Sequence, residues 1–410
     1  MDFIFDKIAD RLGGRDFENS TKLYKFAKIK IAKAEARMKN PGIALIDMGV
    51  GEPDIPADGL VAAILSQEAK KAENRWYSDN GIPEFQEAAA RYLKKVYGLN
   101  NVDPYKNIIH GIGSKPILAM IPLMFINPGD ITLATIPGYP VISTYTQYLG
   151  GEAYNLPLHR ENDFYPGFSD IPHDILKRAK LLYINYPNNP TGQVATEEFY
   201  KRVVEFAYKN NIVVISDAAY GALVYGDNKP LSFLSVDGAW EVGLEIHSLS
   251  KAFNMTGWRL AFAVGNSKLM EAYGIVKNNT DSGQFRAIQK AGIYALDHTE
   301  ITEHNCRRYS RRFDLLIDAL KEVGFDAVKP KGSFYCYVPC PKRTKSGIVF
   351  SNAEEVSDYL IRQALVSTVP WDDAGAYLRF SVTFEASSEN EEKTVIEEMK
   401  TRLKRLEFLF

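Results

Sequence analysis

The chain has 410 residues, of which 46% are hydrophobic, and its 49 Lys and Arg residues nearly balance 51 Asp and Glu residues. A chain of this length and composition can bury a large core, which predicts a globular protein with one large domain and a smaller companion. Because the charges cancel, no strong overall field favours nucleic acid or an anionic membrane. Small, specific ligands are therefore the expected partners.

The cysteines and the N-terminal segment indicate the cellular compartment. Cys306, Cys336 and Cys340 are odd in number and lack nearby histidines to complete a zinc site, so we interpret them as reduced thiols and expect no metal centre. Charges interrupt the apolar residues of segment 1–16, which therefore has no signal-peptide core. The longest apolar stretch, Pro116–Ile126, is too short to span a bilayer. We expect a cytoplasmic protein.

The first predicted element is a helix over Thr21–Met38, which has no strand nearby and is expected to pack on the smaller domain. From about residue 47 to residue 264, apolar β-branched runs alternate with amphipathic helical patterns such as Ile82–Tyr97 and Thr196–Lys209. This alternation is typical of a mainly parallel sheet with helices on both faces. The predicted strands are Ala44–Val50, Asn107–Ile112, Asp130–Ala134, Leu181–Asn185, Ile212–Ser216, Leu244–Ser248 and Leu260–Val264.

After about Ile301 the pattern changes to a long charged helix over His304–Gly324, followed by short strands around Phe334–Val338 and Leu378–Val382. These elements predict a smaller α+β domain. We therefore expect an N-terminal arm and helix in residues 1–50, a large domain in residues 51–300 and a small C-terminal domain in residues 301–410.

Two Gly-x-Gly fragments follow predicted strands, Gly49-Val50-Gly51 and Gly111-Ile112-Gly113. A dinucleotide-binding fingerprint needs a third glycine, but that position holds Asp54 in the first fragment and Pro116 in the second. The sequence also has no Walker A motif. These observations disfavour a nicotinamide or nucleoside triphosphate site.

The motifs that carry chemistry are distributed along the chain, and all but the last lie at or near predicted strand ends. They are Asn188-Asn189-Pro190-Thr191-Gly192, Asp217-Ala218-Ala219-Tyr220, Ser248-Leu249-Ser250-Lys251, Arg259 and Arg379. Each motif is weak alone, but the spacings of 28, 34 and eight residues from Asn189 through Asp217 and Lys251 to Arg259 form a specific combination. In order and spacing the motifs resemble the fold-type I aminotransferases of class I/II over nearly the whole chain. The resemblance implies an α/β fold like that of aspartate aminotransferase, which binds pyridoxal 5′-phosphate (PLP).

The resemblance implies that Lys251 binds PLP as a Schiff base and then moves the substrate α-proton. A lysine near a strand end is, without the motif, more often a surface charge. Asp217 ends a largely apolar run, where a buried carboxylate needs a partner. The protonated ring nitrogen of PLP would be that partner, and a helix N-cap is the alternative role for this residue.

The same resemblance assigns the other cofactor contacts. Tyr220 and Asn189 would hydrogen-bond the phenolic oxygen of PLP, and Tyr139 would stack on its ring, although all three could instead be packing or turn residues. Arg259 would grip the phosphate in a charge-assisted, bidentate way. The further phosphate contacts would be Ser248 and Ser250, with the loop at a helix N-terminus that contains Gly113, Ser114 and Lys115.

Substrate recognition is implied for a second group of residues. Arg379 matches the arginine that pairs with the substrate α-carboxylate, and Gly51 would let the backbone approach the same carboxylate. Asn189, Tyr24 and Asn279 are the further candidate substrate contacts. The homologous enzymes are homodimers, so a homodimer that acts on amino acids and 2-oxo acids is expected.

Within the family, longer strings resemble the LL-diaminopimelate aminotransferases. These strings are Tyr24–Ile29, Ala179–Gly192, Phe253–Arg259 and Asn279–Gly283. Those enzymes reversibly move an amino group from glutamate to tetrahydrodipicolinate, which gives LL-diaminopimelate and 2-oxoglutarate in lysine and peptidoglycan biosynthesis. The alternatives are an aspartate, alanine or aromatic aminotransferase, a PLP-dependent C–S lyase, or a non-catalytic ligand sensor of the same fold.

Two segments depart from the family pattern. One residue fewer than usual separates Tyr77 from Gly81, which leaves open whether Tyr77 reaches the phosphate site of a neighbouring subunit. The loop Ser367–Tyr377 lacks the glycine-rich stretch that similar enzymes carry before the carboxylate-binding arginine. This loop is expected to reshape the substrate pocket.

Overall fold

The computed structural model describes residues 3–17 and 25–410, and the chain divides into two compact units. The larger unit comprises Gly51–Asp314 and Val328–Cys336. The smaller unit comprises Leu315–Ala327, Tyr337–Phe410 and the described residues up to Val50. None of the helices in the described residues combines the length and apolar composition that a bilayer crossing requires.

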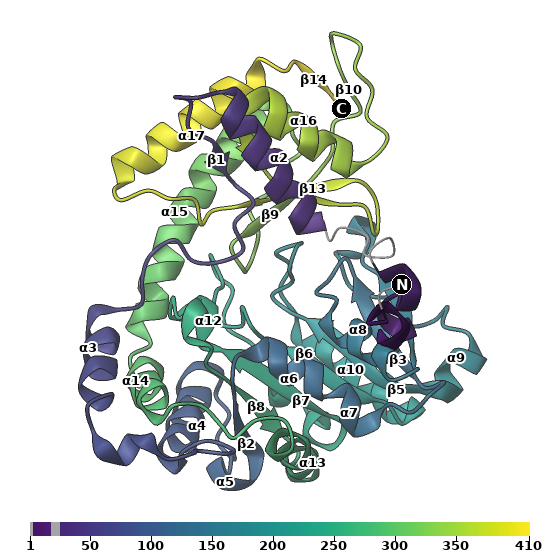
Figure 1. Ribbon diagram of the computed structural model, residues 1–410, viewed down its shortest axis with the longest axis vertical. Helices are drawn as coiled ribbons and strands as arrows, with labels where there is room; N and C mark the ends of the chain where they lie inside the picture. The colour runs from purple at the N-terminus through teal and green to yellow at the C-terminus, as the bar shows by residue number, and fades with distance from the viewer. Residues whose placement is uncertain (1–2, 18–24) are drawn as a thin grey trace. The chain divides into compact units, whose positions relative to one another are not determined.

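The larger unit is built on a seven-stranded sheet with the strand order β2-β8-β7-β6-β5-β3-β4 (Figure 1). Strands β7, β6, β5, β3 and β4 run parallel to one another, and β8 is antiparallel to its neighbours β2 and β7. The predicted mainly parallel sheet is therefore confirmed. The strands are β2 (Ile108–Gly111), β3 (Ile131–Ile136), β4 (Glu152–Pro157), β5 (Ala179–Asn185), β6 (Val213–Asp217), β7 (Gly243–Ser248) and β8 (Ala261–Gly265).

Helices cover both faces of this sheet, because successive strand residues point to opposite sides and both sides are apolar. In β6, Val214 packs in one core cluster and Ile215 in the other. The first cluster includes residues of α4, α10 and α14, and the second includes residues of α6, α8 and α13. The principal helices are α3 (Gly59–Glu68), α4 (Pro83–Tyr97), α6 (Ser114–Met120), α8 (Val141–Tyr148), α10 (Glu197–Asn210), α12 (Leu249–Ala252), α13 (Ser267–Asn278), α14 (Arg286–Asp297) and α15 (Glu300–Val323), of which α15 continues into the smaller unit.

Most predicted elements of the larger unit are present with small shifts at their ends. Helix α10 begins after Thr196, whose side chain accepts a hydrogen bond from the Phe199 amide and so caps the helix. The predicted strand Ala44–Val50 is wrong as a member of the large sheet. Only β1 (Ile46–Asp47) forms there, and it pairs in parallel with β11 (Val366–Ser367) in the smaller unit. Strand β4 at the sheet edge was not predicted, because its partly exposed residues give no apolar run.

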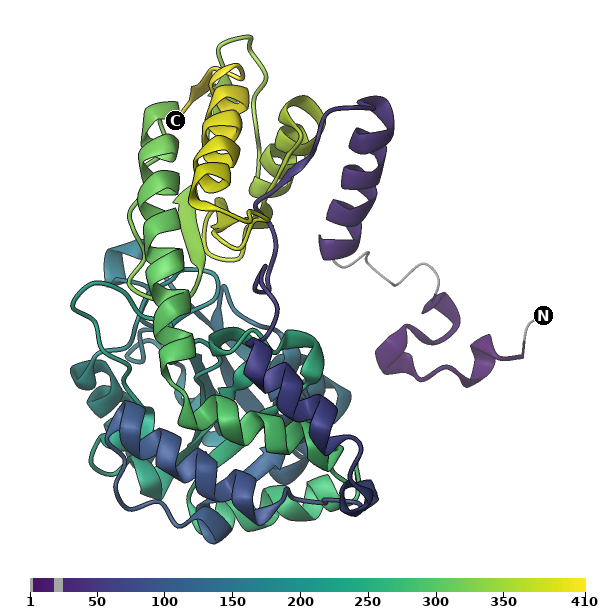
Figure 2. The ribbon, with the colours of Figure 1, turned by 90° about the vertical axis from the view of Figure 1, so that its left-hand side faces the viewer.

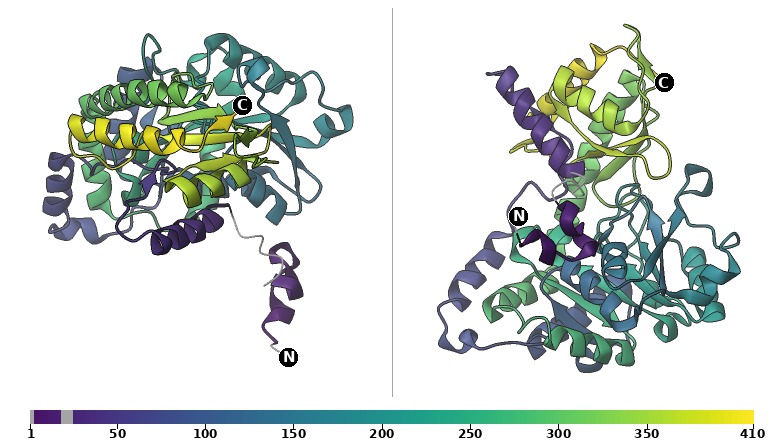
Figure 3. Two further views of the ribbon diagram at one scale, coloured as in Figure 1. Left: turned by 90° about the horizontal axis from the view of Figure 1, so that it is seen from above. Right: turned by 45° about the vertical axis from the view of Figure 1, so that its right-hand side comes forward.

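The smaller unit contains a three-stranded sheet in the order β12-β13-β9, together with α2, α16, α17 and the end of α15. Helix α2 packs on α16, where ion pairs join Lys28 to Glu354 at 2.9 Å and Glu35 to Arg362 at 2.8 Å (Figure 3). Helix α17 lies beside the C-terminal part of α15, and Lys404 pairs with Glu322 at 2.7 Å (Figure 2). The bounds are α2 (Lys25–Lys39), α16 (Ala353–Ala364), α17 (Glu389–Lys404), β9 (Tyr335–Pro339), β12 (Val369–Trp371) and β13 (Tyr377–Ser381).

Candidate active site

The ends of strands β5, β6 and β7 bring the sequence motifs together. Asn185 of β5 lies opposite Asp217 of β6, and Asp217 lies opposite Ile246 of β7. The carboxyl ends of parallel strands meet at one edge of a sheet, which is where ligands bind in such folds. The loops that follow these strand ends carry Asn189, Tyr220 and Lys251, so one edge holds three of the predicted cofactor contacts.

Lys251 lies in the short helix α12, directly after β7, and is half-buried. Its Nζ donates a hydrogen bond to the carbonyl oxygen of Gly51 at 2.7 Å and lies 5.8 Å from the ring centroid of Phe334. Ser248 caps this helix, since its Oγ accepts from the Ser250 amide at 3.2 Å. The structure thus brings the predicted lysine to the predicted substrate-binding glycine, although the two are far apart in sequence.

Asp217 is a buried carboxylate with two neutral hydrogen-bond donors. Its side chain accepts from the Tyr183 hydroxyl at 3.0 Å and from the Ala219 amide at 3.1 Å, and the residue is 4% exposed. Burial raises the pKa of Asp217 to about 6, and the two hydrogen bonds only partly oppose this. The residues after Asp217 form a turn and not a helix, so the alternative role of helix N-cap does not apply.

Asn185 ties the Asn189 loop to the end of β6. Its Oδ1 accepts from the Asn189 amide at 3.0 Å, and its Nδ2 donates to the Asp217 carbonyl at 2.8 Å. At the end of the same loop, Gly192 has a φ of +72°, and a Cβ there would lie 2.5 Å from Pro330. Only glycine fits that position without a shift of its neighbours. The loop that presents Asn189 is therefore fixed at both ends.

Tyr220 and Tyr139 occupy different environments. Tyr220 is buried, its hydroxyl lies 3.1 Å from the Tyr335 hydroxyl, and its ring meets that of Phe334 edge-on. Tyr139 is half-buried after β3 and packs against the core cluster that contains Tyr183. Both lie in the larger unit with Asp217.

The guanidinium of Arg259 lies directly against Gly113. Arg259 follows the 3₁₀ turn η7 (Thr256–Trp258) in a left-handed backbone conformation with φ +59°, and its Nη1 donates to the Thr256 carbonyl at 2.8 Å. A Cβ on Gly113 would lie 2.1 Å from Nη2 of Arg259. The guanidinium therefore occupies space that only a glycine leaves open. Ser114 and Lys115 begin α6 at the same place, Ser114 half-buried and Lys115 exposed.

The remaining predicted residues belong to other elements. Arg379 is in β13 of the smaller unit, 2% exposed, with its Nη2 donating to the Gly49 carbonyl at 3.1 Å. Asn279 is exposed at the end of α13, where its Nδ2 donates to the Ile275 carbonyl at 2.8 Å. Tyr77 is 78% exposed. Tyr24 falls outside the described residues.

Two residues of the site escaped the sequence reasoning, Tyr183 and Asn185. Both interrupt the fully buried part of β5, Leu181–Asn185, with polar atoms. Buried tyrosine and asparagine side chains need hydrogen-bond partners, so their presence in such a run signals a polar contact. The sequence does not identify the partner. In the structure Tyr183 donates to the Asp217 carboxylate and Asn185 donates to the Asp217 carbonyl.

Comparisons with known proteins agree with this arrangement. Residues 43–397 match the family described as aminotransferase class I and II. A protein from Methanocaldococcus jannaschii named LL-diaminopimelate aminotransferase is 56% identical over 416 residues, which cover 100% of this chain and 99% of that protein. Substrate-bound BacF from Bacillus subtilis superimposes with a TM-score of 0.87 at 33% identity, over 96% of this chain and 97% of that one.

A single mutant of Thermus thermophilus aspartate aminotransferase superimposes with a TM-score of 0.83 at 26% identity, over 96% of this chain and 99% of that one. This likeness confirms the predicted aspartate aminotransferase-like fold. The family predicted from the motifs is confirmed as well, and the chain belongs to the class I and II aminotransferases.

Proposed function

We propose that this protein is a PLP-dependent LL-diaminopimelate aminotransferase, which moves an amino group reversibly between glutamate and tetrahydrodipicolinate. The observation that carries the reaction type is the gathering of Lys251, Asp217 and Asn189 at one sheet edge of a class I and II aminotransferase. The substrate assignment draws on the relative from M. jannaschii, which matches the whole chain and bears that name.

The residues present fit PLP in two respects. Asp217 is a buried carboxylate whose hydrogen-bond donors, Tyr183 and the Ala219 amide, are both neutral, so a protonated pyridine nitrogen would supply the missing positive charge. Gly113 lets the Arg259 guanidinium lie against the residue that precedes α6, so a phosphate bound there would find a bidentate donor. When bound, PLP supplies the electron sink that lets the substrate α-proton leave.

The protein's own groups then have distinct tasks. Lys251 would hold the cofactor through its Nζ and, once the substrate amine has replaced it, would use the same nitrogen to remove the α-proton. Tyr220 and Asn189 would donate hydrogen bonds to the phenolic oxygen of the cofactor, and Tyr139 would cover the ring. Ser114, Lys115, Ser248, Ser250 and Arg259 would hold the phosphate. Arg379 would bind the substrate α-carboxylate, with the Gly51 backbone as a further contact and Asn189 close to the substrate.

Replacement of Gly113 by alanine is expected to weaken PLP binding about tenfold. The new Cβ would collide with Arg259, and the φ of +85° strains any residue with a side chain by roughly 1–2 kcal/mol. Gly98→Ala is the matched control, because Gly98 has a φ of +72° at the end of α4 but no atom within 4 Å of the added Cβ. Titration of the apoprotein with PLP measures both, and wild-type affinity in Gly113→Ala would contradict the phosphate assignment.

An amino-donor panel tests the substrate. With 2-oxoglutarate as acceptor, LL-diaminopimelate should give the highest kcat/KM among LL-diaminopimelate, aspartate, alanine and the aromatic amino acids. Inactivity toward LL-diaminopimelate beside good aspartate or alanine turnover would replace the proposal with another aminotransferase. Release of pyruvate from cystathionine would indicate a C–S lyase instead. Lys251→Ala serves as the blank for every donor.

We also propose that the protein is a homodimer, as its family resemblance implies. The exposed aromatic side chains of Trp76 and Tyr77, 57% and 78% exposed, are consistent with a surface that a second copy covers. Light scattering of the PLP-loaded protein should give twice the chain mass, and a monomer mass would refute the proposal.

A further inference from the structure

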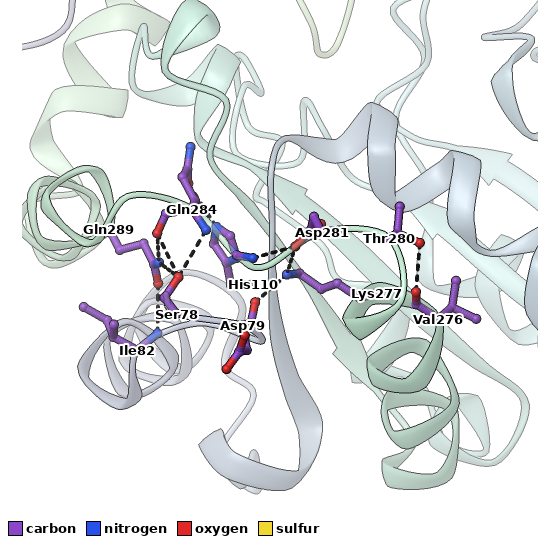
Figure 4. Close-up of polar contacts among 11 residues, drawn as sticks. Ser78, Asp79, Ile82, His110, Val276, Lys277, Thr280, Asp281, Gln284 and Gln289 are labelled. Atoms are coloured by element: carbon purple, nitrogen blue, oxygen red, sulfur yellow. Dashed lines mark hydrogen bonds and ion pairs between the residues drawn. The ribbon is translucent and has the colours of Figure 1, made fainter. Parts of the chain in front are cut away.

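A polar network holds the loop that contains Ser78 and Asp79 against residues 279–285, the segment between α13 and α14 (Figure 4). Ser78 is its centre, because its Oγ donates to the Gln284 carbonyl at 2.8 Å and accepts from the Gln284 amide at 3.1 Å. Gln289 joins it, with Nε2 2.8 Å from Ser78 Oγ and Oε1 2.9 Å from the Ile82 amide. The backbone of Gln284 is thus fixed on both sides.

A buried ion pair with a residue of α13 holds the same segment in place. Lys277, which is 0% exposed, lies 2.6 Å from the Asp281 carboxylate, and that carboxylate accepts from the Gly283 amide at 2.8 Å. Gly283 has a φ of +83°, and a Cβ there would lie 2.5 Å from Ser78 Oγ. The two loops therefore touch at a point where no side chain fits, and Gln284 follows directly.

From this fixed backbone the Gln284 side chain reaches the turn that precedes Arg259. Its Nε2 donates to the carbonyl oxygens of Trp258 and Arg259, both at 2.8 Å. Carbonyl oxygens only accept, so the amide nitrogen must face them and the amide oxygen must face His110, whose Nε2 lies 2.9 Å away. His110 therefore donates from Nε2, and burial, which lowers its pKa to about 4, keeps the ring neutral.

These bonds act on a strained residue. Arg259 has a φ of +59°, a conformation that residues with a side chain rarely adopt unless neighbouring contacts hold it. Thr256 and Gly113 place its guanidinium, whereas Gln284 is the side chain that binds the carbonyl groups on either side of its backbone turn. Loss of the two donated bonds would remove this support, and we expect the guanidinium to move with the turn.

We propose that Gln284 is a positioning residue for the cofactor phosphate: it holds the backbone of Arg259 so that the guanidinium is preorganised for a phosphate dianion. This inference rests on the proposed PLP function. Gln284 itself would touch neither cofactor nor substrate. Its effect would pass through Arg259 alone, and it should therefore be specific to the phosphate group.

The test compares PLP with pyridoxal, which has the same ring and aldehyde but no phosphate. Apoprotein is titrated with each, and the dissociation constant of pyridoxal divided by that of PLP measures the contribution of the phosphate to binding. In Gln284→Met the ratio should fall about tenfold, because PLP affinity drops while pyridoxal affinity stays within about twofold of wild type. Gln284→Glu keeps the size and the acceptor for His110 but cannot donate to two carbonyls. It should show the same fall in the ratio as Gln284→Met.

Gln289→Met is the matched control. Gln289 belongs to the same network and is fully buried, yet its amide reaches Ser78, the Gln284 carbonyl and Ile82 and not the carbonyls of the Arg259 turn. It should lower the melting temperature and change the ratio of dissociation constants less than Gln284→Met does, because it loosens the Gln284 backbone but keeps the two bonds to the Arg259 turn. An equal change in this control, an unchanged ratio in Gln284→Met, or failure of both Gln284 variants to fold while Gln289→Met folds would each overturn the inference.

The wild-type protein separates this inference from the proposed function. If wild type binds PLP more tightly than pyridoxal but Gln284→Met keeps the same preference, the phosphate site stands and the role of Gln284 is wrong. If wild type shows no preference for PLP, the proposed cofactor site fails and the role of Gln284 fails with it.

Discussion

Replacement of Lys251 by alanine should abolish transamination and remove the visible absorbance of the proposed Schiff base between Lys251 and PLP. General acid–base catalysis by one positioned group contributes roughly 10²–10⁴-fold, and here the same amine also holds the cofactor, so a loss of roughly 10³-fold or more in kcat is expected. In the structure the Lys251 amine donates a hydrogen bond to the Gly51 carbonyl at this sheet edge. Absorbance spectra and single-turnover assays measure both effects.

Lys268→Ala is the control for this variant, because Lys268 is an exposed lysine in the first turn of α13, outside the site. It should retain wild-type spectrum and turnover. A Lys251→Ala protein that kept the visible absorbance and turned over amino acids would refute the central assignment. Retention of PLP without turnover would agree with it, since the phosphate and ring contacts would remain.

Replacement of Asp217 by asparagine should lower kcat by roughly 10²–10⁴-fold, since removal of one partner of a buried ion pair costs about 3–5 kcal/mol. Asparagine is close in size and can still accept from Tyr183 or the Ala219 amide, so the fold should survive. The variant loses the negative charge that we propose faces the ring nitrogen. Steady-state assays of the PLP-saturated variant measure the loss, and activity within a few-fold of wild type would show that this carboxylate does not face the cofactor.

The apoprotein gives an independent measurement of the same residue. Burial raises the pKa of Asp217 from 3.8 to about 6, so the folded state binds this proton more tightly than the unfolded state does. The stability from the protonated form is complete below pH 3.8 and is lost as the pH rises to about 6. Relative to Asp217→Asn, wild-type apoprotein should therefore lose about 3 kcal/mol of unfolding free energy across that interval. Denaturant titrations at several pH values measure it, and parallel stability curves would contradict the burial argument.

The sequence was sufficient for the sheet edge that carries the chemistry. The predicted strands Leu181–Asn185, Ile212–Ser216 and Leu244–Ser248 each end within one residue of β5, β6 and β7, because strands buried on both faces leave continuous apolar runs. Each motif follows one of these strands closely in the sequence, so the position of the strand in the sheet also gives the position of the motif. Strand β1 shows the limit, since its short apolar run does not state which of two sheets it will join.

The contacts that tune the site could not be derived in this way. Tyr183 meets Asp217 across 34 residues, and Gln284 meets the Arg259 turn across 25. Neither residue belongs to a motif whose spacing states its partner. Their hydrogen bonds depend on the register of neighbouring strands and on the approach of two loops at Gly283, which only the folded chain fixes.

The separation along the chain also orders the assembly of the site during folding. The part of the site proposed for the ring nitrogen, Asn185 with Asn189 and Asp217, closes over at most 32 residues of contiguous chain. The network behind the proposed phosphate site joins Ser78 to Gln284 across 206 residues, and closing this longer loop costs roughly 1–2 kcal/mol more, so we expect the contact to form later in folding. At a synthesis rate of 5–20 residues per second, roughly 10–40 s separate the appearance of these two residues. The strands made first must therefore hold together before Gln284 has been made, and the proposed phosphate contact of Arg259 gains the support of that side chain only afterwards.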